Sequence, residues 1–280
     1  MQKVTSIIQL REKLHQWRKQ DEIIAFVPTM GNLHAGHIKL VLAARKKADK
    51  IVVSIFVNPT QFGVGEDFES YPRTEENDEK KLKEATADLL FLPSVLEMYP
   101  QTMDTVVSVT ELSTRHCGKS RPKHFNGVAT VVAKFLNMVQ PDIAFFGEKD
   151  YQQLAIIRKM VDDLNISCEI VGVETERELD GLAMSSRNNY LTERERKIAP
   201  KLYHSIRKAR ENVLSGVQSL IVIEKEQQGY LASLGFIVDY FSICRCDNLY
   251  PAKDSDNEIV ILVAAKLGKL RLIDNIYFSR

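Results

Sequence analysis

Two histidines flank a glycine near the end of the segment from Pro28 to His37, which reads Pro-Thr-Met-Gly-Asn-Leu-His-Ala-Gly-His. The apolar run Ile23 to Val27 before it predicts a buried strand, and Ile38 to Ala48 after it predicts a helix. The glycine removes side-chain bulk where phosphates could approach the backbone, and free N–H groups at a helix start favour an anion. His34 and His37 could donate hydrogen bonds to phosphoryl oxygens in a transition state. The pattern predicts a site that activates a nucleotide.

The pattern His-x-Gly-His on its own also fits a simpler interpretation, in which both histidines merely face solvent or the core. Two further polar loops favour the chemical interpretation. Residues 58–63 follow the apolar run Ile51 to Val57, and Gly147 to Asp150 follow the run Ile143 to Phe146. All three loops stand at the carboxyl ends of predicted strands, so we expect them to converge on one crevice.

Strands and helices alternate through this first part of the chain. A further strand is predicted at Leu89 to Leu92, and helices are predicted at Thr74 to Ala87, Asn126 to Met138 and Tyr151 to Asp163. The alternation predicts an α/β fold in which a parallel sheet is covered by helices on both faces.

The pattern changes after about Val173. Residues 177–189 are polar and rich in turn formers, and Thr192 to Glu195 read as a capping box that opens a long helix to about Leu214. A second helical stretch follows, and then strand-like runs at 236–244, 258–265 and 269–276. We therefore expect two domains, residues 1–174 and residues 175–280, of which the second is a smaller α+β domain.

Composition argues for small-molecule substrates. The 280 residues carry a formal net charge of +1, with no basic patch that would indicate nucleic acid as a partner. No apolar run has the length of a membrane span, and the first residues lack the apolar core of a secretory signal, so we expect no membrane partner and a cytoplasmic protein. The four cysteines, Cys117, Cys168, Cys244 and Cys246, form no disulfide framework or zinc pattern, and we expect them to be reduced.

Two groups of residues could hold phosphates and a ribose. Ser185, Ser186 and Arg187 place two hydroxyls and a fixed cation on one turn, where they could close over a triphosphate. Lys149 could neutralise phosphate while Asp150 accepts a hydrogen bond from a ribose hydroxyl. Each group also fits an ordinary charged surface loop.

Together these segments resemble the pantothenate synthetase family, also called the pantoate-beta-alanine ligases, of the nucleotidyltransferase superfamily. The likeness spans nearly the whole chain. It is carried, in the family's order, by Pro28 to His37, Phe56 to Phe62, His124 to Val128, Phe146 to Gln153 and Ser185 to Asn188.

The resemblance implies a Rossmann-like nucleotidyltransferase domain, followed by a C-terminal lid domain, and a two-step reaction. ATP and pantoate would form pantoyl adenylate and pyrophosphate, and the amine of beta-alanine would then displace AMP to give pantothenate. Adenylation is needed because an amine that attacked a free carboxylate would have to expel an oxide, which is a poor leaving group. Mg²⁺ would accompany ATP, with protein ligands that the sequence does not name, and the protein would be a homodimer.

The resemblance also implies roles for single residues. His37, His34 and Lys149 would be catalytic, with His37 as the proton donor. Gln61 and Gln153 would bind pantoate through their amides, with Met30 and Asn58 in the same pantoate and beta-alanine site. The ATP site would consist of Met30, Gly31, Asn32, Leu33, His34, Ala35, Gly36, His37, Gly147, Glu148, Lys149, Asp150, Glu176, Met184, Ser185, Ser186 and Arg187. Arg121 and His124 would lie near it.

The chain departs from the family pattern at two places. Lys123 stands where glycine is common, which adds bulk and charge to a loop. Glu174 replaces a proline, and Glu176 stands where a small apolar residue meets the adenine. If that contact is made by backbone atoms, the Glu176 side chain can point outward.

Two other functions compete with this interpretation. A cytidylyltransferase-like enzyme would keep the fold and act on a phosphorylated acceptor, but it would not need the segments around Gln61 and Gln153. A regulatory module that only binds ATP would not need both histidines together with Lys149 and Arg187.

Overall fold

The computed structural model describes residues 1–63 and 65–280. In the first part of the chain, six parallel strands form one sheet in the order β1-β4-β3-β2-β5-β6. The strands are β1 (Gln2–Val4), β2 (Ile24–Thr29), β3 (Lys50–Ile55), β4 (Leu89–Phe91), β5 (Ile143–Gly147) and β6 (Glu169–Val173). The chain leaves β2 toward β3 on one side and later returns to β5 on the other. This places a topological switch point between β2 and β5, where ligands bind in such sheets.

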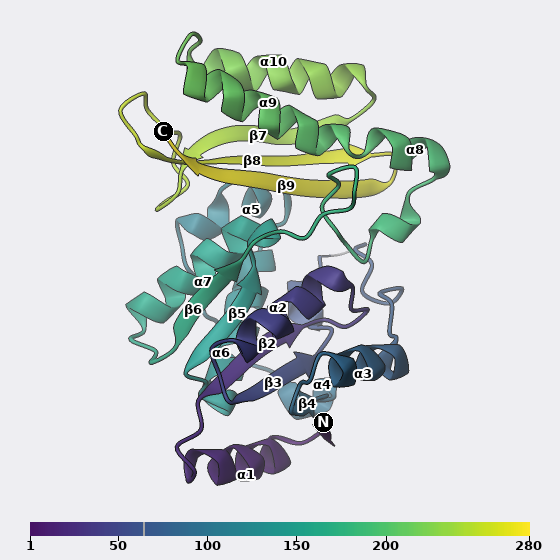
Figure 1. Cartoon of the computed structure of the whole chain (residues 1–280), viewed down its shortest axis with the longest axis vertical. Coiled ribbons are helices and arrows are strands. Elements are labelled where there is room, and N and C mark those ends of the chain that lie inside the picture. The colour runs from purple at the N-terminus through teal and green to yellow at the C-terminus, as the bar shows by residue number, and fades with distance from the viewer. Residues whose placement is uncertain (64) are drawn as a thin grey trace.

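Helices cover both faces of this sheet, as predicted for a parallel sheet (Figure 1). One apolar core joins one face of the sheet to α1 (Ile7–Arg18), α6 (His124–Val139) and α7 (Tyr151–Asp163). A second core joins the other face to α2 (Ala35–Arg45) and α3 (Glu75–Glu84). The predicted α/β fold is confirmed. The short helices α4 (Val95–Met98) and α5 (Cys117–Ser120) lie in the connection between β4 and α6.

The C-terminal part holds an antiparallel sheet of β7 (Ile237–Arg245), β8 (Glu258–Leu267) and β9 (Leu270–Ser279) in that order. One face of this sheet packs on α9 (Lys201–Ser215) and α10 (Leu220–Ser233), and α8 (Glu193–Ile198) precedes them (Figure 1). On the other face, Cys244, Val260 and Leu262 join the core that contains α6 and α7. The three-stranded sheet is therefore buried on both faces and fixed to the first part of the chain. The α+β character predicted for this region is confirmed, while the boundary at residue 174 stays a prediction.

Of the predicted helices, Tyr151–Asp163 has its predicted bounds. The helix predicted at Thr74 to Ala87 is shorter in the structure, where α3 spans Glu75–Glu84, and the one predicted at Asn126 to Met138 is longer, where α6 spans His124–Val139. Two further helices differ for physical reasons. The helix expected to run from Thr192 to about Leu214 is interrupted between α8 and α9, because Pro200 has no N–H to donate and its ring disfavours a continuous helix. The capping box at its start is present, with Glu195 N donating to Thr192 Oγ1 at 3.3 Å. The helix expected from Ile38 begins at Ala35 instead, because His34 and His37 cap its start.

The parallel sheet and its covering helices also include elements that the sequence did not predict, namely β1, α1 and β6. β1 has three residues, of which one is buried, and β6 shows no fully buried residue, so neither gives a clear apolar run. Both are edge strands of the sheet. Their pairing is set by neighbouring strands that lie far away in the sequence. No helix in the described ranges is both long and apolar enough to cross a bilayer.

Lys123 gives a first testable prediction, because it precedes α6 in the left-handed conformation with φ of 70°. The Cβ atom makes this conformation costly for lysine but not for glycine, which is common at this position in the family that the sequence resembles. The side chain is exposed, so its removal loses little contact. We expect Lys123→Gly to raise the free energy of unfolding in urea by about 0.5 to 1 kcal/mol.

The matched control is Lys46→Gly. Lys46 is also exposed and ends α2, but its φ is −78°, which lysine adopts without strain. This change is expected to lower stability by up to about 1 kcal/mol. Destabilisation by both variants to the same extent would contradict the strain at Lys123.

Candidate active site

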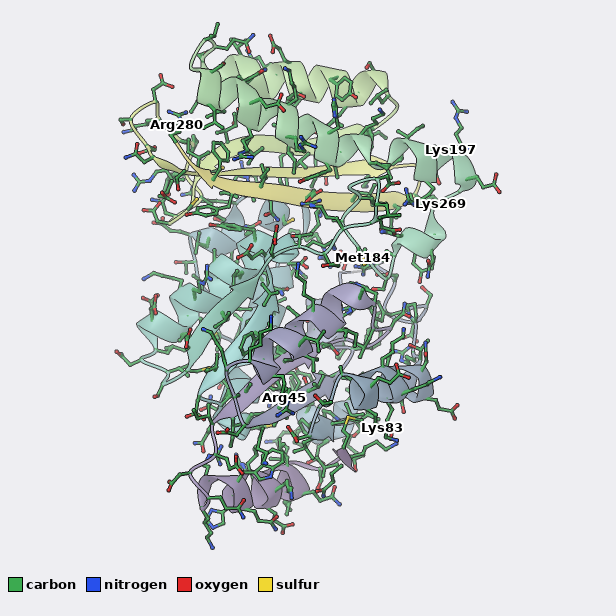
Figure 2. The ribbon with its side chains drawn as sticks, in the orientation of Figure 1. Arg45, Lys83, Met184, Lys197, Lys269 and Arg280 are labelled. Carbon is green, nitrogen blue, oxygen red and sulfur yellow. The ribbon has the colours of Figure 1, made fainter. Side chains whose placement is uncertain are left out.

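A cavity of about 270 Å³ opens at the switch point between β2 and β5, at the carboxyl ends of the parallel strands. The segment from Val173 to Arg187 forms another part of its wall, so the connection between the two sheets contributes to the site. Met184 lies on this connection, between the two parts of the molecule (Figure 2). The predicted site residues that line the cavity are Met30, His34, Gly36, His37, Asn58, Gln61, Gly147, Lys149, Asp150, Gln153, Glu176, Met184, Ser185, Ser186 and Arg187.

Five residues of the predicted ATP site do not line this cavity, namely Gly31, Asn32, Leu33, Ala35 and Glu148. Leu33 is 2% exposed and belongs to the core between the sheet and α2. Ala35 is exposed to solvent. The Glu148 carboxylate lies against the backbone of Gly172, where a built Cβ would come within 2.9 Å of it. These five residues therefore contribute nothing to the wall of this cavity, and their place in the ATP site stays a prediction.

The turn after β2 depends on a buried carboxylate that the sequence did not reveal. Gly31 and Asn32 have φ of 82° and 49°, so the chain reverses sharply there. Asp78 on α3 is 1% exposed and accepts hydrogen bonds from the backbone N–H groups of Asn32 and Leu33, both at 2.8 Å. Hydrogen bonds of this charged type are stronger than neutral ones. Asp78 thereby fixes the direction from which the chain enters α2.

The two histidines form a capping box at the start of α2. His34 is the N-cap residue, and its Nδ1 accepts a hydrogen bond from Gly36 N at 3.1 Å. His37 is the third residue of the helix, and its Nδ1 accepts from His34 N at 3.2 Å. These bonds satisfy backbone N–H groups that a helix start leaves without partners, which explains why α2 begins at Ala35. The spacing of three residues thus has a structural role in addition to any chemical one.

Capping also sets the protonation of both rings. Since each Nδ1 accepts a hydrogen bond, each neutral ring carries its proton on Nε2, as the hydrogen-bond network assigns it. Burial, together with His34 and Lys149 nearby, lowers the pKa of His37 to about 3. Burial and Lys149 lower the pKa of His34 to about 4. At neutral pH the pair therefore offers two Nε2–H donors without positive charge, and these suit hydrogen bonds to phosphate better than full proton transfer.

Gln61 is held in place by a hydrogen-bond network at the cavity wall. Asn58 donates from Nδ2 to Gln61 Oε1 at 3.1 Å and to Gly127 O at 3.2 Å, and its Oδ1 accepts from Tyr99 OH at 2.8 Å. Gly127 permits this contact, since a Cβ there would lie 2.3 Å from the carbonyl oxygen of Thr60. The polar atoms of Asn58 are thus occupied by protein partners, which favours a role in holding the loop over direct contact with a substrate.

Arg121 and His124 lie beside this loop, in the region where the resemblance expects them. His124 Nδ1 is 2.8 Å from Gln61 O, and Arg121 Nη1 is 3.1 Å from His124 Nε2. Arg121 also donates from Nε to Glu66 Oε1 at 2.7 Å. Burial and the Arg121 cation lower the pKa of His124 to about 4. The cluster adds one cation to the cavity wall and keeps His124 neutral.

The Glu176 side chain points toward α2. Its Oε2 lies 3.1 Å from Lys39 Nζ, and Glu174 Oε2 lies 4.0 Å from the same nitrogen. The Glu176 backbone oxygen accepts a hydrogen bond from Met184 N at 2.9 Å. A Cβ on Gly36 would come within 3.6 Å of the Glu176 Cβ, so the segment passes close over the His-x-Gly-His turn. The unusual glutamate is thus accommodated by an ion pair at the cavity rim.

Arg187 is paired with a residue that sequence reasoning missed. Asp67 accepts two hydrogen bonds from it, from Nε and from Nη2, both at 2.8 Å. Tyr71 lies beside them, with its ring centroid 5.5 Å from the Arg187 guanidinium carbon. No local pattern marks Asp67, since its partner is 120 residues away. The only available signal was its position in the same loop as Gln61.

The chain that builds this geometry is similar to known proteins along its whole length. A family model described as pantoate-beta-alanine ligase matches residues 2–277. The chain belongs to the pantoate-beta-alanine ligase family. It is 52% identical to a curated pantothenate synthetase from Alcanivorax borkumensis, over 99% of this chain and 97% of the relative. A pantothenate synthetase from Pseudomonas fluorescens Pf-5 is also 52% identical, over 100% of this chain and 98% of the relative.

Solved structures of this family superimpose on the whole chain. A pantothenate synthetase from Thermus thermophilus gives a TM-score of 0.93 at 45% identity, covering 99% of both chains. A pantoate-beta-alanine ligase from Francisella tularensis, solved in complex with beta-gamma ATP and beta-alanine, gives a TM-score of 0.83 at 36% identity. It covers 99% of this chain and 97% of that chain. The comparison confirms the fold of both sheets.

The lowered histidine pKa values predict how the stability of this family member depends on pH. Between about pH 4 and 6.5 the unfolded chain binds protons at positions 34, 37 and 124 that the folded chain does not, so the free energy of unfolding rises with pH in this window. His37→Asn removes one of these three proton-binding groups from the unfolded chain. We expect the slope of unfolding free energy against pH, measured by urea denaturation, to fall by at most about 1.4 kcal/mol per pH unit.

The control for this measurement is His15→Asn, since His15 is an exposed residue of α1. A fall in slope is attributed to His37 where it exceeds the change measured in this variant. An unchanged slope in His37→Asn would show that His37 titrates normally in the folded protein and that its pKa is not lowered.

Proposed function

We propose that this chain joins pantoate to beta-alanine at the expense of ATP, through pantoyl adenylate, with release of pyrophosphate and AMP. The observation that carries the proposal is that one cavity, in a chain of this family, is lined by both histidines, Lys149, Arg187 and two glutamines. The first four suit a triphosphate, and the glutamines suit a small hydroxy acid.

The first step would take place at the α-phosphorus of ATP. An oxygen of the pantoate carboxylate forms a bond to this phosphorus while the bond to the pyrophosphate oxygen breaks, so the negative charge moves to pyrophosphate. His34 and His37 would donate from Nε2 to phosphoryl oxygens, and Lys149 with Arg187 would neutralise the leaving group. Ser185 and Ser186 would add hydroxyl donors, and Asp150 with Gly147 would hold the ribose. Positioning and charge stabilisation supply the catalysis, without a covalent protein intermediate.

The pantoate end of the cavity would combine two amides with an apolar wall. Gln61 and Gln153 would bind the hydroxyl and carboxylate oxygens, while Met30 would contact the methyl groups. Gln61 Nε2 is 3.0 Å from Met30 Sδ, which brings the polar and apolar contacts together. The wall continues through Val128, Val131, Val132 and Phe135 of α6. In the second step the amine of beta-alanine attacks the acyl carbon, and the bond to the AMP oxygen breaks.

We propose that magnesium enters with ATP. In residues 1–63 and 65–280 no group of three or more histidine, cysteine, aspartate or glutamate side chains is placed to hold a metal ion. Mg²⁺ binds readily through phosphate oxygens and water with few protein ligands. When bound it would neutralise phosphate charge, while the residues above orient the reacting groups.

We also propose, from the resemblance of the sequence, that the protein is a cytoplasmic homodimer. The division into residues 1–174 and 175–280 is supported by the end of β6 at Val173, after which the chain leaves the parallel sheet. The segment that follows lines the cavity, as a lid would.

The decisive assay is exchange of labelled pyrophosphate into ATP. We expect exchange that depends on pantoate and needs no beta-alanine, and AMP release coupled to pantothenate once the amine is added. Exchange driven by a different acid would redirect the proposal to another substrate. Folded protein that binds ATP without any exchange would favour a binding module.

His37→Ala is expected to slow adenylation in single turnover by about a hundredfold or more, because one donor to the developing charge is lost. His15→Ala, at an exposed position outside the cavity, serves as the control. Adenylation at a near-normal rate in His37→Ala would remove this residue from the catalytic group.

A further inference from the structure

Two neighbouring carboxylates in the loop after β3 bind two arginines that line the cavity. Glu66 pairs with Arg121, from the turn before α6, and Asp67 pairs with Arg187, from the connection after β6. Both arginines face the space in which an anionic substrate would lie. The loop therefore influences the two cations that this space offers.

The pair of Asp67 and Arg187 is well defined. Asp67 accepts from Nε and Nη2 at 2.8 Å each, which is the bidentate arrangement that fixes the plane of a guanidinium. The two side chains are only 29% and 34% exposed. Hydrogen bonding to Arg187 lowers the pKa of the Asp67 carboxyl, so the pair stays charged through the neutral range. Tyr71, 5% exposed, limits the space beside the guanidinium.

The contact uses only one edge of the guanidinium. Arginine has five N–H donors, and Asp67 occupies the edge formed by Nε and Nη2. Among the residues that the structure describes, both hydrogens of Nη1 and the second hydrogen of Nη2 stay available for a further ligand. A carboxylate on one edge thus holds the arginine while three donors remain for phosphate oxygens.

The same loop also carries the pantoate end of the site. Gln61 lies six positions before Asp67 and is anchored by Asn58 to Gly127 of α6. Arg121 donates from Nη2 to Gln61 O at 3.4 Å and from Nε to Oε1 of Glu66, the neighbour of Asp67, at 2.7 Å. These contacts relate the position of Arg187 to that of Gln61. In-line transfer requires this relation, because the pantoate oxygen and the leaving pyrophosphate must be aligned.

We propose that Asp67 is a positioning residue, which holds the Arg187 guanidinium so that its free edge meets the triphosphate of ATP. The inference rests on the proposed function, in which Arg187 binds the triphosphate. Asp67 itself does not contact the substrate in this arrangement.

The test is a double-mutant cycle on ATP binding, measured by calorimetry on the full-length protein with adenosine as a second ligand. We expect Asp67→Asn to weaken ATP binding about tenfold, which is typical for a lost hydrogen bond to a charged group. Arg187→Ala is expected to weaken it at least as much. Adding Asp67→Asn to Arg187→Ala should change ATP affinity less than twofold, because the residue that Asp67 positions is then absent.

Adenosine distinguishes positioning from a general loss of structure. It lacks phosphates, so its affinity should stay within twofold of wild type in all three variants. Glu69→Gln is the matched control, since it removes the same charge from an exposed position of the same loop, and it should leave ATP binding unchanged. Asp67→Glu keeps the carboxylate and should fall between wild type and Asp67→Asn.

Three results would overturn the proposal. Tighter ATP binding by Asp67→Asn would mean that Asp67 competes with phosphate for Arg187. Independent, additive losses in the double variant would mean that the two residues act separately. An equal loss of adenosine affinity would reveal a purely structural role. The double-mutant cycle measures ATP binding without turnover, so its result is independent of the exchange assay on the wild-type protein. That assay alone tests the proposed function.

Discussion

The site depends on one constraint, which is that the backbone N–H groups between β2 and α2 need hydrogen-bond acceptors. A sharp turn followed by a helix start leaves several N–H groups without partners. Asp78 accepts from two of them, His37 accepts from His34, and His34 accepts from Gly36. Since the imidazoles cap the helix through Nδ1, their Nε2–H groups stay available to a ligand as far as residues 1–63 and 65–280 are concerned. One set of contacts therefore builds the turn and prepares its chemistry.

Burial at this turn has an electrostatic consequence. Histidines in water are partly charged near neutral pH, whereas burial and nearby cations keep His34 and His37 neutral by lowering the pKa of each ring. The fixed positive charges at the cavity come from Lys149, Arg121 and Arg187 instead. Two of these cations are already paired with carboxylates, Glu66 and Asp67. The site thus separates the task of donating hydrogen bonds from that of neutralising charge.

Local patterns in the sequence predicted those parts of the structure that depend on local physics. The helix Tyr151–Asp163 was predicted with its observed bounds, because its apolar residues recur at helical spacing. The three polar loops were expected at one crevice, and residues from all of them line the cavity. The start of α2 was predicted three residues late, because histidine is not a usual capping residue.

What the sequence could not reveal are contacts across long separations. Asp78 lies 46 residues from Asn32, and Asp67 lies 120 residues from Arg187. An acidic residue in either segment looks like an ordinary solvated charge until the chain folds. The edge strands β1 and β6 depend in the same way on pairing with distant neighbours.

The antiparallel sheet has a consequence for how the chain is made. Cys244, Val260 and Leu262 complete a core that begins with Val4 and lies mostly in the first part of the sequence. During synthesis that first part leaves the ribosome well before these residues do, and it must wait with an apolar surface uncovered. This core is therefore complete only once β7 and β8 have been made, and uncovered apolar surface of this kind favours aggregation until then.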